Sequence, residues 1–259
     1  MANNDTIKKT LTVALTLCVV CSVLVSGAAV LLKPMQQANI LQDKKRNILS
    51  AGGMLQPGVD IDEQFEAITA RVVDVETGRF TDAVDPLTFD DRGAARDPQY
   101  AVQLSGSEDI AGIRQHSRYM VVYLVTDAAG DIQTLILPIS GYGLWSTMYG
   151  FVALEPDFNT ISGLGFAEHG ETPGLGGEID NPTWQAGWEG KKVFDPNTGE
   201  LKFTVVKGQV DSDHPEAVHR VDGLSGATLT GRGVQDMIRF WLGDNGFRPF
   251  LDNLRNGEA

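Results

Sequence analysis

One short stretch, LSGATLTGRG at 224–233, gathers three hydroxyl side chains among residues that have little side-chain bulk. Ser225, Thr228 and Thr230 follow one another closely, and glycine or alanine flanks them. The residue types leave four interpretations open: a plain turn, a helix cap, a phosphate-binding loop, or a point of covalent attachment. Each of these makes a different demand on the rest of the chain.

The phosphate-loop interpretation fails at the residues that would carry its chemistry. Gly226 and Gly231 have the spacing of the nucleotide-triphosphate loop G-x-x-x-x-G-K-[ST]. Arg232, however, stands where that loop has its lysine, and Gly233 stands where it has the magnesium-binding hydroxyl. The sequence therefore argues against an NTPase.

The cap and the attachment interpretations both use the helix that we predict after the motif. Thr228 or Thr230 is a candidate N-cap, although neither has Glu or Gln three residues later, so there is no capping box. Spacing alone favours this cap or a turn. Attachment explains more, because small residues leave room for a bulky group and a helix N-terminus favours a phosphate. A threonine hydroxyl can form a phosphoester.

A second stretch, EHGETPGLGGEI at 168–179, predicts a tight and irregular loop because it is rich in glycine and contains a proline. The backbone of such a loop can lie against a flat ring. Glu171 and Thr172 offer hydrogen-bonding groups, and Leu175 offers an apolar face. Taken alone, the loop is as well explained as a surface turn, and Trp145 as a core tryptophan.

The N-terminal segment LTVALTLCVVCSVLVSGAAVLL at 11–32 has no charged residue and is long enough to cross a bilayer as a helix. A cleaved secretory signal is the competing interpretation, with Ser26-Gly27-Ala28 as a cleavage site. The apolar run continues to Leu32, beyond the usual end of a signal, so we predict an uncleaved anchor. Lysines on both sides of the span leave its orientation undecided.

The cysteines and histidines predict no metal centre. Cys18 and Cys21 lie inside the apolar segment, where we interpret them as small apolar side chains. The remainder of the chain has no cysteine, which excludes a disulfide or a cysteine-ligated metal there. The spacing of His169, His214 and His219 fits no zinc pattern, so we interpret these residues as solvent-exposed polar residues of loops.

The net charge of −13 argues against a nucleic-acid partner. After a tail at 1–10 and the anchor at 11–32, residues 33–118 predict a helical stem and a loop-rich part. In this stem Gly52-Gly53 ends one helix. Asp60 caps a second helix, whose single apolar face holds Ile61, Phe65, Ile68 and Val72.

Residues 119–259 predict a β-rich domain. Two apolar runs flank Asp127–Gly130 and indicate a hairpin, and ELKFTVVKG at 200–208 indicates another strand. Pro182 starts a short helix, and the apolar residues from Val234 to Trp241 fit a helix of about three turns. Helices and strands do not alternate strictly, so we predict an α+β fold with a mixed, largely antiparallel sheet.

The motif SGATLT at 225–230 resembles the S-G-A-T-x-T motif of the covalent FMN-binding domain family. Two further blocks, GYGLWSTMYGFVAL at 141–154 and the 168–179 loop, extend the resemblance, as does the N-terminal anchor. Together they make essentially the whole chain similar to the C subunit of the Na+-translocating NADH:quinone reductases. The blocks occur in the family's order and show no departure from it.

The resemblance implies a covalent FMN on Thr230, bonded through its phosphate, with Ser225, Gly226, Ala227, Thr228 and Leu229 around that phosphate. It further implies that Trp145 and the loop residues line the isoalloxazine pocket, namely Glu171, Thr172, Gly174 and Leu175. In the family a separate flavin transferase moves FMN from FAD. Thr230 is then an acceptor, and no residue of this chain is catalytic.

The family further implies an electron-relay subunit in a bacterial inner membrane. FMN on the periplasmic side passes electrons between a membrane-embedded centre and the flavin of the B subunit, with the B, D and E subunits, and through them A and F, as partners. No dinucleotide fingerprint follows a strand, so we expect no NADH site, and we expect no quinone site either. Two alternatives stay open: the flavinylated subunit of an Rnf-type ferredoxin:NAD reductase, and an anchored periplasmic binding or scaffold protein without flavin.

Overall fold

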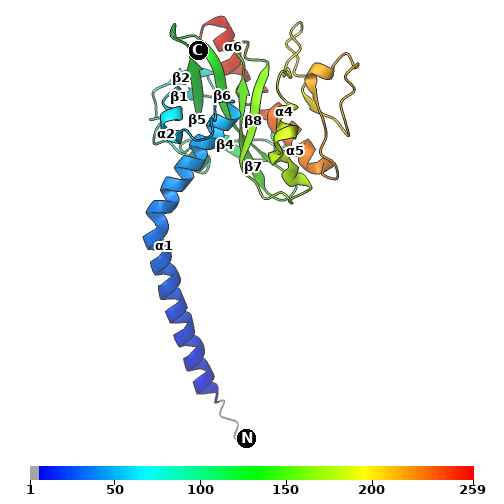
Figure 1. The fold of residues 1–259 in the computed structure, drawn as a ribbon. Coiled ribbons are helices and arrows are strands. Elements are labelled where there is room, and N and C mark those ends of the chain that lie inside the picture. The colour runs from blue at the N-terminus through cyan, green and yellow to red at the C-terminus, as the bar shows by residue number, and fades with distance from the viewer. Residues whose placement is uncertain (1–5) are drawn as a thin grey trace. The chain divides into compact units, whose positions relative to one another are not determined.

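The computed structural model describes residues 6–259, and Figure 1 shows the course of the chain. The helices are α1 (Ile7–Ala51), α2 (Ile61–Phe65), α3 (Asp91–Ala94), α4 (Pro182–Ala186), α5 (Thr228–Trp241) and α6 (Arg248–Asn256), with 3-10 turns at Gly176–Asp180 and Ala217–His219. The strands are β1 (Ile68–Asp74), β2 (Arg79–Thr81), β3 (Ala101–Gln103), β4 (Gln115–Ser117), β5 (Tyr119–Thr126), β6 (Ile132–Tyr142), β7 (Thr147–Leu154), β8 (Ile161–Glu168), β9 (Thr204–Val205) and β10 (Arg220–Val221).

Helix α1 contains the apolar N-terminal segment. Residues 6–43 are all exposed, and the helix is long and apolar enough to cross a membrane. The chain divides into one compact unit that ends at Asp43 and a second that begins at Lys44. The predicted helix stop is confirmed: α1 ends at Ala51, and Gly53 adopts a positive φ of 67°.

Six strands form one antiparallel sheet in the order β2-β1-β5-β6-β7-β8. The predicted hairpin is confirmed as β5 and β6. In its turn the Asp127 carboxylate accepts hydrogen bonds from the backbone N–H groups of Ala129 and Asp131. A side chain that bonds its own turn in this way is the usual reason for aspartate at such a position.

Both faces of the sheet are buried within the second unit. The central residues Leu135, Ile136 and Leu137 are each 0 % exposed although they point alternately to opposite faces. One face packs against α5 and α6. The other packs against the last turns of α1, through Ile48 and Leu49, and against α2. These two layers of helix on one antiparallel sheet confirm the α+β class.

One predicted helix is partly wrong. Asp60 does cap a helix, since its carboxylate accepts from the N–H groups of Asp62 and Glu63. That helix ends at Phe65, however, and Ile68 and Val72 belong to strand β1, where they lie opposite Val125 and Val121 of β5. Two β-branched residues at i and i+4 share one face in a helix and also in a strand. Pairing with β5 stabilises the strand here.

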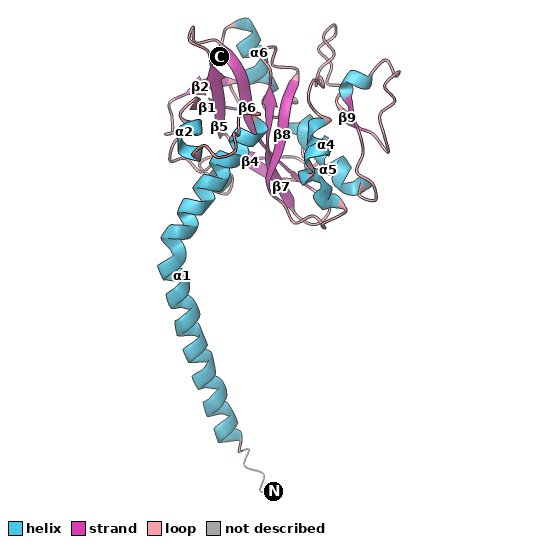
Figure 2. Ribbon diagram, in the orientation of Figure 1, coloured by secondary structure: helices cyan, strands magenta, loops and turns pink. Residues whose placement is uncertain are grey.

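The later elements follow the sequence more closely. Helix α4 starts at Pro182 with Asn181 as its side-chain cap, and α5 covers the predicted apolar residues. The strand predicted at 200–208 is reduced to the two residues of β9, which pair in parallel with β10. The segment between α4 and α5 is mostly loop (Figure 2).

Candidate functional site

Three segments that are far apart in the sequence meet at the start of α5. The first is the β6–β7 connection at 143–146, the second is the loop at 169–175 that follows β8, and the third is the SGATLT motif. Hydrogen bonds join the first segment to the second and the second to the third. The two sequence blocks that accompany the motif are therefore its neighbours in space.

Helix α5 begins without a side-chain cap. Its N-cap residue is Ala227, and among the described residues 6–259 no side chain forms a cap hydrogen bond. The prediction that Thr228 or Thr230 caps this helix is therefore wrong, because both lie inside the first turn. The first N–H groups of a helix have no intrahelical partner, so this end remains a donor site with the positive end of the helix dipole.

The two threonines of the motif have opposite environments. Thr228 is exposed, as are Ser225, Gly226 and Leu229, whereas Ala227 is buried and Thr230 is 0 % exposed. A buried hydroxyl needs a hydrogen-bond partner, and leaving it without one costs about 1–3 kcal/mol. Thr230 Oγ1 donates to Glu171 Oε2 at 2.5 Å. The structure thus joins one residue from each of the two blocks that the sequence singles out.

The other oxygen of Glu171 holds the β6–β7 connection. Glu171 Oε1 accepts from the backbone N–H groups of Leu144 and Trp145, at 2.9 and 3.0 Å. Burial raises the pKa of Glu171, but the hydrogen bonds from Thr230, Trp145 and Leu144 together bring it below the ordinary value. The carboxyl is consequently ionised at neutral pH, and its charge is satisfied by three donors.

Two residues that were not predicted to belong to the site support this arrangement. The Ser146 hydroxyl accepts from the N–H of Gly170, and His169 Nδ1 accepts from the N–H of Glu171. His169 Nε2 lies 2.7 Å from Asp180 Oδ2. The interpretation of His169 and His219 as solvent-exposed loop residues is wrong. The His169 side chain is only 15 % exposed, and His219 is buried.

Glycines lie on both sides of the Thr230–Glu171 pair, and a larger residue at either position would displace these side chains. A Cβ at Gly176 would lie 2.5 Å from Thr230 Oγ1 and 2.6 Å from Glu171 Oε2, and a Cβ at Gly143 would lie 2.5 Å from Glu171 Oε1. All three distances are too short for a real side chain. The glycines of the two family-like blocks therefore make space for this pair.

Large apolar side chains surround the site and remain exposed. Trp145 is 65 % exposed, so its interpretation as a core tryptophan is wrong. Leu144, Leu175 and Leu229 are exposed as well. Leu175 also approaches the motif, because its Cδ2 lies 3.1 Å from the position of a Cβ at Gly226, whose φ is 71°. An exposed apolar group of this kind is typical of a ligand or partner surface.

Two other predicted site residues shape the loop and lie on its outer side. The carbonyl of Thr172 accepts from the N–H groups of Leu175 and Gly177. Gly174 has a φ of 76° and has open space where a side chain would be. Both are exposed. Their part is to set the turn that carries Leu175 over the motif.

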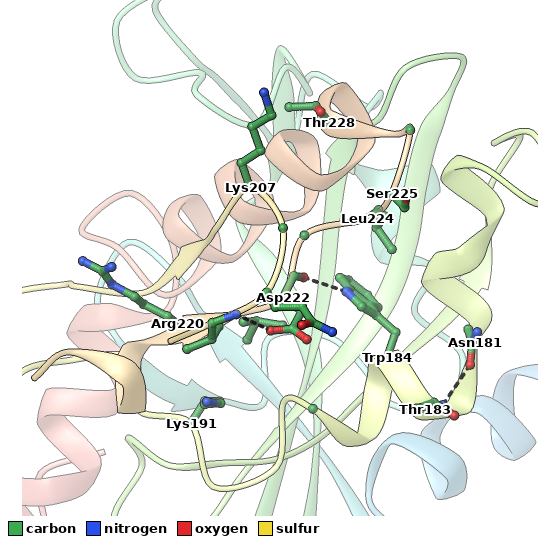
Figure 3. Close-up of a pocket in the computed structure, with 17 residues that line it drawn as sticks. Asn181, Thr183, Trp184, Lys191, Lys207, Arg220, Asp222, Leu224, Ser225 and Thr228 are labelled. Carbon is green, nitrogen blue, oxygen red and sulfur yellow. Dashed lines mark hydrogen bonds between the residues drawn. The ribbon is translucent and has the colours of Figure 1, made fainter. Parts of the chain in front are cut away.

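A pocket of about 970 Å³ opens beside the exposed side of the motif (Figure 3). Ser225, Gly226 and Thr228 border it, together with Trp184, whose Nε1 donates to the carbonyl of Asp222 at 2.8 Å. Three basic residues also line this pocket, namely Lys191, Lys207 and Arg220. Asp222 lines the pocket as well, and Arg220 pairs with Glu216 at 3.2 Å, so the two lysines supply most of its positive charge.

Comparison with known proteins shows what this arrangement is similar to. The family described as FMN-binding domain matches residues 143–243, which include the β6–β7 connection, the 169–175 loop and α5. The C subunit of the Na+-translocating NADH-quinone reductase of Pseudomonas aeruginosa is 52 % identical, with 100 % of both chains covered. The same subunit of Yersinia pestis is 49 % identical over 98 % of this chain and 96 % of that protein.

Solved structures agree with the sequence relatives. The crystal structure of Shewanella oneidensis NqrC has a TM-score of 0.77 and 36 % identity, and the match covers 85 % of this chain and 99 % of that one. The C subunit of the Parabacteroides distasonis reductase has a TM-score of 0.64 and 29 % identity, with 85 % and 96 % covered. The fold, the site and the full-length relatives agree, and the chain belongs to the family of the C subunit of the Na+-translocating NADH-quinone reductase.

Proposed function

We propose that Thr230 carries FMN through an ester between its Oγ1 and the FMN phosphate, and that this flavin relays electrons within the reductase. Membership of the C-subunit family makes the chain part of an oxidoreductase complex that contains an FMN-binding domain. In our proposal the flavin takes electrons from a membrane-embedded centre and passes them to the flavin of the B subunit. NADH oxidation, quinone reduction and sodium translocation belong to other subunits.

The observation that carries the proposal is the uncapped start of α5. Thr230 lies in its first turn, where the free N–H groups and the dipole favour an anion. The positive φ of Gly226 leads the chain into this turn. A phosphate attached to the first turn would therefore meet donors that no side chain of the motif occupies.

The apolar surroundings suit the ring of a flavin. Trp145, Leu144 and Leu175 present exposed apolar surface next to the motif, although burying such side chains is favourable. An isoalloxazine ring that lay against them would cover this surface. When bound, FMN supplies one- and two-electron redox chemistry, and the chain supplies its position and its electrostatic surroundings.

The pocket beside the motif suits the attachment step. Lys207 is exposed at its border, and Lys191 adds positive charge. These cations favour the approach of the anionic FAD from which a flavin transferase takes FMN. The exposed residues Ser225 and Thr228 give the transferase a surface of the motif to contact.

The remaining parts of the proposal concern the membrane and the partners. Residues 11–32 of α1 serve as the anchor in a bacterial inner membrane, and the flavin domain, from residue 119 onward, lies on the periplasmic side. The B, D and E subunits are the neighbours, with A and F reached through them. An apolar helix supports the membrane anchor, and relatives that are subunits of a reductase complex support the presence of partner subunits.

The two alternatives that the sequence left open are weaker than this proposal. The full-length relatives are C subunits of the quinone reductase, which favours that complex over an Rnf-type reductase. The scaffold interpretation required SGATLT to be a helix cap, and no motif side chain caps α5.

The test is the retention of flavin under denaturing conditions. The full-length subunit is produced in a host that has the flavin transferase, and its intact mass and in-gel flavin fluorescence are measured. We expect wild type and Thr230→Ser to carry one FMN, because both keep a hydroxyl, and Thr230→Val to carry none. Fluorescence that persisted in Thr230→Val would move the attachment to Thr228 or Ser225, and loss of all flavin from denatured wild type would exclude a covalent bond.

A further inference from the structure

The hydroxyl that the proposed function would esterify is covered in this structure. Thr230 is 0 % exposed, and its hydroxyl hydrogen points to a Glu171 oxygen 2.5 Å away. Ester formation replaces that hydrogen by phosphorus. The phosphorus therefore needs the space in front of Oγ1, and the Glu171 carboxylate occupies this space.

Gly176 is a second close neighbour of the hydroxyl. Gly176 lies so close that even a Cβ at this position would be 2.5 Å from Thr230 Oγ1. Glu171 is itself 5 % exposed, with the β6–β7 connection on its far side. A phosphate can reach Oγ1 only after a neighbour has moved, and the carboxylate is the neighbour that lies on a flexible side chain.

Electrostatics argues in the same direction. Before attachment the hydroxyl donates to an ionised carboxylate, which is a stabilising, charge-assisted hydrogen bond. After attachment Thr230 has no proton to donate, and a phosphodiester anion replaces it. Two anions at hydrogen-bond distance repel each other, so the contact between Glu171 and position 230 cannot survive modification.

The geometry points to Glu171 as the residue that controls access to Thr230. We propose that its carboxylate shields the Thr230 hydroxyl in the unmodified subunit and withdraws when the flavin phosphate binds. Because the same carboxylate holds the N–H groups of Leu144 and Trp145, its withdrawal releases the backbone of these two residues and lets Trp145 move to the flavin. This inference rests on the proposed attachment at Thr230.

The attachment reaction itself is a group transfer without a redox step. The Thr230 Oγ1–phosphorus bond forms, and the phosphorus–oxygen bond of the FAD pyrophosphate breaks. AMP leaves with the electron pair of that bond, and the hydroxyl proton is released to a base on the transferase. Glu171 acts here as a positioning residue, since it decides when Oγ1 becomes free to react.

The first experiment measures the rate of attachment. Full-length subunit in detergent, made in a host without the transferase, is mixed with purified transferase and FAD, and the gain of FMN is followed by intact mass. We expect Glu171→Ala to react about tenfold faster than wild type, because the hydrogen bond to a charged group no longer has to be broken. Glu171→Gln keeps the size without the charge and should lie between the two.

The matched control is Glu168→Gln, three residues earlier in the chain, whose carboxylate pairs with Arg92 and not with Thr230. Its rate should equal that of wild type. A rate for Glu171→Ala that is equal to or below that of wild type would overturn the shielding role. If wild type itself gained no FMN, the proposed attachment would fail, and with it this inference.

The second experiment needs no variant and therefore does not depend on the folding of one. Hydrogen exchange of the Leu144 and Trp145 amides is compared in wild type before and after full attachment of FMN. We expect the exchange of these amides to become at least about tenfold faster after attachment, since each loses its carboxylate acceptor. Unchanged exchange in fully modified protein would show that Glu171 had not moved.

Discussion

The indole Nε1 of Trp241 donates a hydrogen bond to the backbone carbonyl of Ser140, at 2.7 Å. Trp241 ends helix α5 and Ser140 lies near the end of β6, so this bond fixes the helix along the strand. The contact between α5 and β6 continues at Gly141 of β6, which faces Met237 of α5. The first turn of α5 is thereby brought beside the connection that follows β6, where Glu171 is bound.

Gly233→Ala tests how closely α5 must approach β6. A Cβ at Gly233 would collide with the backbone carbonyl of Tyr142 and would lie 3.2 Å from the Cα of Gly143. Neither backbone atom can move without shifting the strand end. Although alanine favours a helix by about 1 kcal/mol over glycine, we expect a net loss of about 1–3 kcal/mol in the free energy of unfolding. Urea denaturation of the full chain in mild detergent measures it.

Gly231→Ala is the matched control in the same helix. The nearest atom to its Cβ is Cγ1 of Val205, at an ordinary distance of 3.6 Å. This variant should be as stable as wild type or up to about 1 kcal/mol more stable. Equal effects of the two substitutions would mean that the α5–β6 contact is not held by backbone proximity.

Thr230→Val in the unmodified chain tests the hydrogen bond to Glu171. The variant keeps the shape of the side chain but removes one of the donors that hold the pKa of Glu171 below its ordinary value. We expect that pKa to rise and the free energy of unfolding at pH 7 to fall by about 1–3 kcal/mol. Carbon NMR of labelled glutamate and urea denaturation measure the two effects.

The pH dependence of this loss has a definite sign. A carboxyl whose folded pKa is lowered contributes stability above its unfolded pKa, and that stability is lost as the pH falls through the folded pKa. The difference between wild type and Thr230→Val should therefore shrink on acidification below about pH 4. Thr230→Ser retains the donor and should keep the wild-type pKa of Glu171. An unchanged pKa in the valine variant would argue against the bond.

Local features of this fold were predictable from the sequence because their causes are local. The turn at Asp127 and the helix start at Pro182 each depend on residues within a few positions. The spacing of Ile68 and Val72 predicts a helix, whereas the structure has strand β1 there, because its partner β5 lies some fifty residues further along. Pairing between strands so far apart in the sequence cannot be predicted from the spacing of Ile68 and Val72.

The site shows the same limit more sharply. The sequence indicated Thr230 and Glu171 as members of two blocks, but the direct bond between them spans 59 residues and has no local signal. The cap interpretation failed because it required knowing where the helix begins, and a shift of one or two residues turns a cap into a first-turn residue. His169 was misjudged because Asp180, its partner, is contributed by the far side of the loop.

Trp145→Ala separates a role toward the flavin from a role in stability. The side chain is 65 % exposed, so we expect the free energy of unfolding to change by less than about 0.5 kcal/mol. If the indole lies against the flavin, its removal should alter the absorbance and raise the fluorescence of the attached FMN. Trp188→Ala is the contrast, because that indole is 0 % exposed and its loss should cost about 3–5 kcal/mol. An unaltered flavin spectrum in Trp145→Ala would remove Trp145 from the pocket.

His116 should make the second unit less stable in mild acid. The residue is buried, its ring packs against Phe240 and Trp241, and its Nδ1 lies 2.9 Å from the carbonyl of Ser117. Burial lowers the pKa of His116, against a smaller raising effect of that carbonyl. The folded state thus stays neutral where the unfolded chain already binds a proton, and stability is lost as the pH falls below about 6.5.

The loss of stability in acid is limited because His116 binds only one proton. The free energy of unfolding should fall by up to about 1.4 kcal/mol for each pH unit below 6.5, until the folded histidine is protonated as well. His116→Asn keeps a donor for the Ser117 carbonyl but has no titratable group. It loses the ring contacts with Phe240 and Trp241 and should therefore be less stable than wild type at pH 7.5. Because it has no imidazole to protonate, its free energy of unfolding should depend less on pH between pH 7 and pH 5. The free energy of unfolding of both proteins is measured by urea denaturation at each pH. If it fell equally with pH in both, His116 would bind its proton as readily in the folded state as in the unfolded state. This outcome would contradict the prediction that acid weakens the contact between His116 and the end of α5.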